Sequence, residues 1–338
     1  MFDPIEDSMA ALKKGGMVIL VDDHTPGHPL GYLYTLSEHI QPEIINYMIT
    51  QAKGLVCIAL TKERAKFLNI PLMVNPYGEP GEKAFTVSVD YTKTSTGISA
   101  YERAETIQAL LREESSPEDF KRPGHMFPLV AESRGLLDKK GIAEAAVDLA
   151  QFCDSSSLSG TFCEVLGKDG SIANMAELKK RAKEEGLKTV SMTQLYNYRK
   201  KTESLIERIG QFSFPTRYGM LHAIIYINQL DDSEYLVVVE GSVKGLSPIP
   251  LYMYAGNILG DLFVKSEKKG MSNLCRSLEE LKKSGHGVLI YRNIRYPGND
   301  SLQIKQTGTT GEIWDEVIIQ KILKDIHVAD VVVKDSVS

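Results

Sequence analysis

Hydrophobic positions follow two alternating patterns over the first two hundred residues. Apolar residues three and four apart predict amphipathic helices, whereas short apolar or alternating runs predict strands. The main predicted helices are 5–14, a segment after Pro42, a short one after Thr61, 100–111 and 141–152. The predicted strands are 17–21, 54–60, 85–90 and 160–167. Thr61 and Ser99 are expected to be N-caps. This alternation predicts an α/β or α+β fold with a mixed sheet.

The pattern changes after residues 177–205, a charged helical segment that is interpreted as a solvated connector. Strand-like runs then dominate and are joined by helices near 272–283 and 311–323. A chain of 338 residues is also too long for one ordinary core. We therefore predict two domains, 1–205 and 206–338, of which the second has a smaller α/β fold.

Composition places the chain among soluble globular proteins, with 43% hydrophobic and 25% charged residues. No apolar run approaches the roughly 20 residues that a membrane helix needs, and the acidic start does not resemble a signal peptide. A net charge of −5 argues against nucleic-acid and anionic-membrane partners, which are bound through basic faces. The four cysteines form no CxxC pair, so we expect reduced thiols in a cytoplasmic protein.

Several motifs resemble one enzyme family. FTVSVDYTKTSTGISAYERAETI, followed by DFKRPGHMFPL, resembles the core of 3,4-dihydroxy-2-butanone 4-phosphate synthase, an enzyme of riboflavin biosynthesis. GLVCIALTKERA, GIAEAAVDLAQF and GTFCEVLGKDGSIA match the same family in the same order, so the resemblance covers about residues 5–205. In the second domain, FPTRYGMLHAIIYI and GNILGDLF are similar to GTP cyclohydrolase II, which is fused to the synthase in many bacteria and plants.

The resemblance implies a magnesium site, held by a glutamate and a histidine, and a zinc site held by three cysteines. This chain departs from both. The family's acidic loop, close to DDEDRENEGD, becomes DDHTPGHPLGY, and its GHTEA motif becomes GIAEA with Ile142 and Ala143. The zinc cysteines align with Asn257, Lys268 and Gly270. We therefore expect no cofactor, with the Mg and Zn sites lost, and neither ordinary synthase nor GTP cyclohydrolase activity.

Other pocket positions keep groups that can act on a polar metabolite. The candidate catalytic residues are Asp23, Cys57, His125, Glu144 and Glu164. The candidate substrate-binding residues are His24, His28, Thr96, Ser99, Arg103, Thr106 and Lys139, the last in place of the family's usual arginine. Hydroxyl groups can bind sugar-like hydroxyls, the Arg103 guanidinium can meet an anion, and the His125 imidazole suits acid–base chemistry near neutral pH.

Each of these residues also has a structural interpretation. The alternatives are an ion pair for Arg103, turn and cap roles for Thr96 and Ser99, a backbone contact for His125, core filling for Cys57 and a helix-surface position for Glu144. His24 and His28 stand where the family has carboxylates, in a segment whose Pro26 and Gly27 disfavour a helix. A softer metal ion, new substrate contacts and a solvated loop without a role all remain open there.

Two functional hypotheses follow. The first is a repurposed, homodimeric enzyme of lyase or isomerase type, serving secondary metabolism, whose synthase-like domain acts on a small, hydroxylated, anionic molecule without a metal. The second is a catalytically inactive paralogue that regulates or stabilises a riboflavin-pathway enzyme. His125 distinguishes them, because its substitution abolishes function only in the enzyme.

Overall fold

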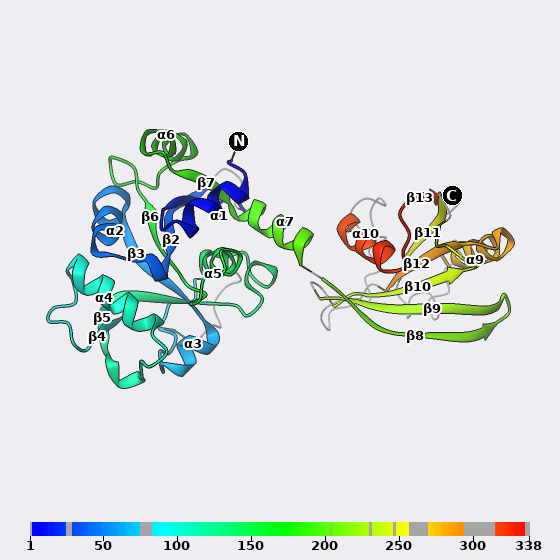
Figure 1. Ribbon diagram of the computed structural model, residues 1–338, viewed down its shortest axis with the longest axis horizontal. Coiled ribbons are helices and arrows are strands. Elements are labelled where there is room, and N and C mark those ends of the chain that lie inside the picture. Colours follow the sequence, from blue (N-terminus) through cyan, green and yellow to red (C-terminus); the bar gives the residue numbers. More distant parts are fainter. Residues whose placement is uncertain are drawn as a thin grey trace. The chain divides into compact units, whose positions relative to one another are not determined.

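The computed structural model describes residues 2–24, 29–74, 83–203, 205–229, 232–245, 248–256, 270–293 and 315–334. The chain divides into two compact units between Arg199 and Lys200, whereas the sequence pattern placed the boundary after residue 205. Each unit is built on its own sheet (Figure 1). Within the described ranges, no helix is both long and apolar enough to cross a membrane.

The first unit contains a seven-stranded mixed sheet in the order β4-β5-β3-β6-β2-β1-β7. Its strands are β1 (Val18–Asp22), β2 (Leu30–Leu36), β3 (Lys53–Thr61), β4 (Val89–Tyr91), β5 (Phe120–Ala131), β6 (Gly160–Val165) and β7 (Lys188–Ser191). Its α-helices are α1 (Ile5–Lys13), α2 (Pro42–Tyr47), α3 (Lys62–Phe67), α4 (Ala100–Leu111), α5 (Ile142–Phe152), α6 (Met175–Glu185) and α7 (Met192–Thr202).

Helices cover both faces of this sheet, as an α/β fold requires. Apolar residues of α1, α5 and α7 join one buried cluster, which includes Leu12, Leu149 and Leu195. Residues of α2, α4 and α6 join a second cluster on the opposite face. Successive residues of a strand alternate between the two clusters, so residues two positions apart point to the same face of the sheet. The predicted fold class is confirmed.

Local signals placed the helix starts correctly. The Thr61 hydroxyl accepts a hydrogen bond from the Arg64 backbone N–H at 3.2 Å, and the Ser99 hydroxyl accepts one from Glu102 N–H, also at 3.2 Å. Both residues are N-caps in extended conformation, as predicted. A side-chain acceptor at this position satisfies one of the amides that a helix leaves unpaired.

Long-range pairing corrects three other expectations. The supposed connector 177–205 contains β7, which pairs in parallel with β1 and is largely buried. β2 begins at Leu30, inside the segment interpreted as a loop, and pairs with β1 and β6. The predicted strand 85–90 is regular only from Val89 onward, with isolated bridges before it. Short strands of mixed polarity show little hydrophobic periodicity in the sequence. Whether such a segment forms a strand depends on the strands it pairs with.

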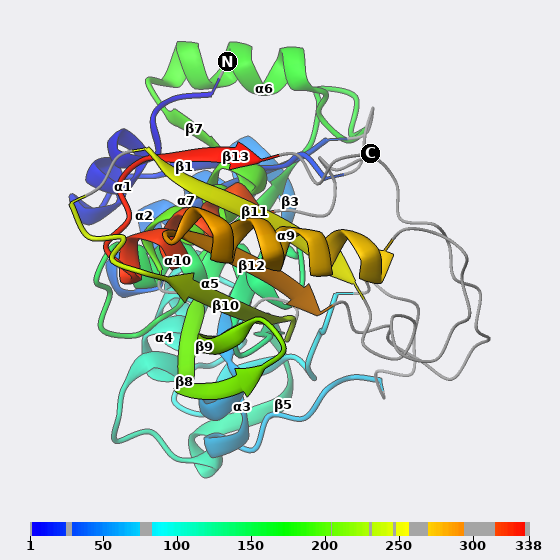
Figure 2. The same cartoon turned by 90° about the vertical axis from the view of Figure 1, so that its right-hand side faces the viewer.

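The second unit contains a six-stranded sheet in the order β13-β11-β12-β10-β9-β8. Its strands are β8 (Ile206–Thr216), β9 (Gly219–Asn228), β10 (Glu234–Glu240), β11 (Ile249–Gly256), β12 (Gly287–Asn293) and β13 (Val331–Lys334), and its helices are α9 (Gly270–Ser284) and α10 (Glu316–Asp325). Figure 2 shows α9 against β11 and β12. Leu281 of α9 packs with Leu221, Val238 and Leu289 from the sheet. The sequence pattern missed β8 and β13.

Candidate active site

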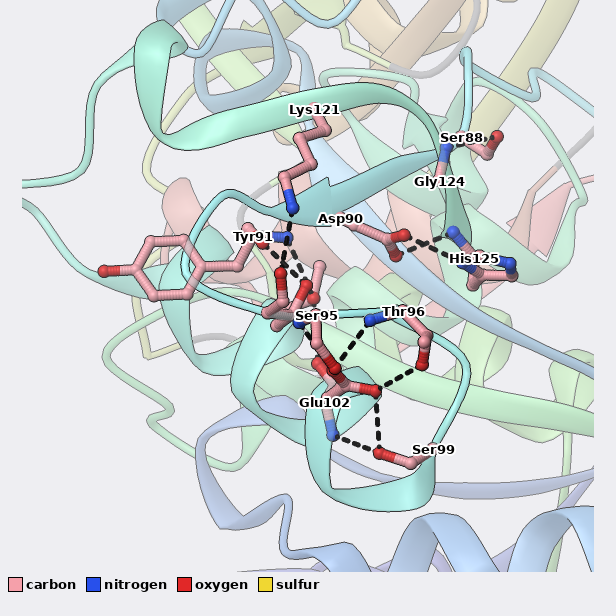
Figure 3. Close-up of polar contacts among 12 residues, drawn as sticks. Ser88, Asp90, Tyr91, Ser95, Thr96, Ser99, Glu102, Lys121, Gly124 and His125 are labelled. Atoms are coloured by element: carbon pink, nitrogen blue, oxygen red, sulfur yellow. Dashed lines mark hydrogen bonds and ion pairs between the residues drawn. The ribbon is translucent and has the colours of Figure 1, made fainter.

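A histidine and an aspartate meet across the pairing of β4 and β5. One carboxylate oxygen of Asp90 accepts a hydrogen bond from the His125 backbone N–H at 2.7 Å, and the other lies 2.8 Å from the ring nitrogen Nδ1 (Figure 3). The Asp90 side chain is 8% exposed, whereas the imidazole is 42% exposed. The aspartate therefore fixes the ring through Nδ1 and leaves Nε2 for a ligand. Sequence reasoning missed Asp90, whose one signal was an acid at the end of the alternating segment 85–90.

The loop before α4 is organised around a second carboxylate, Glu102 (Figure 3). It accepts hydrogen bonds from the hydroxyls of Ser95, Thr96 and Ser99 and from the backbone N–H groups of Ser95 and Thr96, at 2.7–3.1 Å. These bonds, above all the one from the Ser95 hydroxyl, hold the pKa of Glu102 well below its usual range. Thr96 and Ser99, predicted to contact substrate, serve here as turn and cap residues.

Gly97 joins this loop to the His125–Asp90 pair. Its φ angle is +77°, and a Cβ atom built on it would lie 2.0 Å from an Asp90 carboxylate oxygen. Any side chain at this position would displace the carboxylate that orients His125. A glycine is therefore required both by the backbone conformation and by the close approach.

Two residues of α4 occupy other environments. Thr106 is fully buried, where its hydroxyl donates to the Glu102 carbonyl oxygen and accepts from Tyr91 N–H. Arg103 lies on α4, whose buried residues pack with Cys163 in the cluster on the α4 side of the sheet. Burial lowers the pKa of Arg103, and its Nε has no hydrogen-bond partner in the part of the chain that the structure describes.

The face of the sheet that carries His125 also carries Cys57 and Glu164. Cys57 pairs with Phe127 of β5 and with Phe162 of β6. All three pack in the cluster that contains residues of α1, α5 and α7, the α5-side cluster. His125 lies two residues before Phe127, and Glu164 lies two residues after Phe162. Because β3 lies between β5 and β6, His125 and Glu164 lie on either side of it, two strands apart. Three of the predicted catalytic residues thus share one face of the sheet, and Cys57 among them is buried.

Tyr32 completes this surface and was not recognised in the sequence. It pairs in register with Glu164, and its ring contacts Phe162 edge-on. The Lys83 ammonium group lies 3.7 Å from a Glu164 carboxylate oxygen and 5.4 Å from the centre of the Tyr32 ring. Burial raises the pKa of Cys57 to about 12, so its thiol remains protonated at neutral pH.

Glu144 lies far from His125. It is 2% exposed, which corrects the helix-surface interpretation, and it accepts a hydrogen bond from Glu132 N–H at 3.1 Å, just beyond the end of β5. Seven residues of extended chain separate that point from His125, or about 23 Å at roughly 3.3 Å per residue. Burial raises the pKa of Glu144, and the nearby Lys139 opposes that shift. These two predicted residues do not join the His125 surface within one chain.

The rebuilt loop after β1 is partly described. Asp23 accepts hydrogen bonds from the backbone N–H and the hydroxyl of Thr193 at 3.0 and 2.9 Å, which ties its carboxylate to the start of α7. Asp22 instead accepts from His24 N–H at 3.1 Å, and its same oxygen lies 3.3 Å from the His24 ring. His28 lies outside the described residues.

The positions that the resemblance aligns with the family's metal ligands are only partly described. Ile142, which it aligns with the magnesium-binding histidine, is 3% exposed and packs in the core on the α5 side of the sheet. An apolar side chain in a core cannot ligate magnesium. Across the described ranges, no three His, Cys, Asp or Glu side chains converge as a metal site. Of the three zinc positions, Asn257 and Lys268 lie outside the described residues, and Gly270 begins α9.

The fold and this surface define a synthase-type α/β domain followed by a second sheet domain. Residues 6–198 match the family model of 3,4-dihydroxy-2-butanone 4-phosphate synthase, and residues 207–317 match that of GTP cyclohydrolase II. The chain belongs to the 3,4-dihydroxy-2-butanone 4-phosphate synthase family, joined to a GTP cyclohydrolase II-like domain as in bifunctional riboflavin biosynthesis proteins.

Named relatives align with most of this chain or with part of it. The riboflavin biosynthesis protein RibBA of Bacillus subtilis is 40% identical over 292 residues, covering 86% of this chain and 73% of that protein. The crystal structure of RibBX, a two-domain 3,4-dihydroxy-2-butanone 4-phosphate synthase from A. baumannii, aligns with a TM-score of 0.72 and 30% identity over 99% of this chain and 96% of that one. A synthase solved with two magnesium ions aligns over 60% of this chain and 98% of its own, with a TM-score of 0.54 and 31% identity.

Proposed function

We propose that the synthase-like unit is a repurposed enzyme that moves protons on a small, hydroxylated, anionic metabolite without the family's magnesium pair. The His125–Asp90 pair carries this proposal. A buried carboxylate orients an accessible imidazole, which is the arrangement of a general acid–base group. Ile142, which the resemblance aligns with the family's magnesium-binding histidine, lies in the core and supports the loss of the original metal chemistry, because an apolar side chain cannot bind a cation.

The chemistry follows from these side chains. His125 takes a proton from a hydroxyl-bearing carbon beside a carbonyl group and returns it to the carbonyl carbon, while the hydroxyl proton passes to the former carbonyl oxygen, which gives an isomerisation. Return of the proton to a departing hydroxyl group gives a dehydration instead. Glu164 and Lys83 supply an acceptor and a cation on the same surface. The second unit serves as scaffold or as part of a homodimer.

Hydrogen–deuterium exchange tests this function directly. The full chain is incubated in D₂O with pentose phosphates and hydroxylated keto acids, and exchange at the carbon beside the carbonyl is followed by NMR. We expect exchange with at least one compound and its loss in His125→Asn. Magnesium-dependent release of formate from ribulose 5-phosphate would overturn the proposal in favour of ordinary synthase activity. Absence of exchange, together with binding to an active riboflavin-pathway enzyme, would favour the inactive paralogue.

A further inference from the structure

Two tyrosines of β2 differ in how their hydroxyl groups are satisfied. Tyr32 and Tyr34 lie two residues apart, point to the same face and are 2% and 0% exposed. The Tyr34 hydroxyl donates to the Ala146 carbonyl oxygen at 2.8 Å. The Tyr32 hydroxyl is equally buried but has no hydrogen-bond partner among the described residues. Buried polar groups are nearly always paired, so an unpaired one at a candidate site points to a missing ligand.

The surroundings of Tyr32 define the chemistry of that ligand. Lys83 supplies a cation above its ring, Glu164 supplies a carboxylate acceptor beside it, and Asp22 adds a second negative charge nearby. Burial, reinforced by these carboxylates, raises the pKa of Tyr32, so that its hydroxyl is a donor throughout the working pH range. The side chains of Lys83 and Glu164 are 38% and 27% exposed, so the cluster reaches the surface.

We propose that Tyr32 and Lys83 together bind the carboxylate of a hydroxylated carboxylic acid, while Glu164 accepts a hydrogen bond from one of its hydroxyl groups. The flexible stem of Lys83 lets its ammonium group move with the ligand. A singly charged carboxylate suits a site with one cation and two nearby acids better than a phosphate, which carries nearly two charges and needs more donors. This inference rests on the proposed function, because it names the substrate class of the same surface.

Binding to the full chain tests the ligand class. Isothermal titration with glycerate, erythronate and ribonate is compared with butyrate, which lacks hydroxyls, and erythritol, which lacks the carboxylate. We expect one or more of the three hydroxy acids to bind and both comparison compounds to fail. Tyr32→Phe should weaken binding at least about ten-fold, the loss of one hydrogen bond to a charged group. Lack of binding by all three acids, or an unchanged dissociation constant in Tyr32→Phe, would overturn the inference.

Tyr34→Phe is the matched control. It removes a hydroxyl that the fold uses, so it should lower Tm by a few degrees (~1 kcal/mol in a domain of this size) and leave the dissociation constant unchanged. Without ligand, Tyr32→Phe should keep or raise Tm, because its hydroxyl has no partner to lose. A fall in Tm equal to that of Tyr34→Phe would show a structural role for Tyr32 and count against the inference.

The two proposals fail in distinguishable ways. A hydroxylated keto acid that binds through Tyr32 but shows no His125-dependent exchange would leave this binding site standing and remove the catalytic function. Hydrogen–deuterium exchange of the substrate that is lost in His125→Asn but unchanged in Tyr32→Phe would support the catalytic function and exclude Tyr32 as its specificity residue.

Discussion

Both carboxylate oxygens of Asp90 are engaged by a single residue, His125, one through its backbone N–H and the other through ring Nδ1. This arrangement fixes the tautomer in which Nε2 can accept a proton. Asp90→Asn would present an amide donor to Nδ1 and favour the opposite tautomer. We expect the rate of proton exchange to fall at least about a hundred-fold with little change in KM, measured by NMR across a pH series.

Ser88→Ala provides the comparison for Asp90→Asn. The Ser88 hydroxyl accepts from Gly124 N–H at 3.1 Å, one residue before His125, and does not contact the imidazole. We expect its rate to stay within a few-fold of the wild type and its pH profile to be unchanged. Equal losses in the two variants would mean that Asp90 acts only through the local fold.

Breaking the buried ion pair between Asp148 and Arg199 should strongly destabilise the first unit. Their side chains are 2% and 7% exposed, their nearest charged atoms are 2.8 Å apart, and Asp148 also accepts from Leu136 N–H. Asp148→Ala would leave a buried guanidinium without its counter-charge. We expect a loss of about 3–5 kcal/mol in urea unfolding, against less than about 1 kcal/mol for Glu184→Ala in the exposed pair with Lys180. Similar losses would contradict the inferred burial.

Two glutamates should make opposite contributions to the pH dependence of stability. Burial raises the pKa of Glu144 above 4.5, so its folded form holds a proton more tightly than its unfolded form, and its contribution to stability is lost as the pH rises from 4.5 through the folded pKa. The lowered pKa of Glu102 contributes stability above 4.5 that is lost as the pH falls. In chemical denaturation followed from pH 3 to 8, Glu144→Gln should therefore remove a decline in the free energy of unfolding that the wild type shows as the pH rises above 4.5. Glu102→Gln should remove the decline that the wild type shows as the pH falls below 4.5. The reverse assignment would contradict both environments.

Thiol reactivity should separate the four cysteines. Burial raises the pKa of Cys57 and Cys163 to about 12 and that of Cys153 to about 11. Cys275 is partly exposed, and its sulfur lies 3.0 Å from an Arg217 guanidinium nitrogen. Since the thiolate is the reactive form, iodoacetamide at pH 7.5 should modify Cys275 first, as read by peptide mass spectrometry. Faster modification of Cys57 would indicate an activated thiol at the candidate site.

The sequence alone determined what depends on neighbours along the chain. Hydrophobic periodicity and cap residues such as Thr61 and Ser99 located most helices and the apolar strands, because a helix start is decided within one turn. The motif around His125 identified the family. The two-residue alternation along each strand also determined which of its side chains point to the same face.

The tertiary structure decided what depends on partners distant in sequence. β7 forms a strand because it pairs in parallel with β1. Glu144 is buried against the backbone just beyond the end of β5, where it accepts a hydrogen bond from Glu132 N–H. The roles of Asp90 and Tyr32 were decided in the same way. The buried Asp90 carboxylate lies against the imidazole of a neighbouring strand, and the buried Tyr32 hydroxyl has no hydrogen-bond partner among the described residues. Periodicity can place a polar side chain on a face, but only the packed chain determines which donors and acceptors surround it.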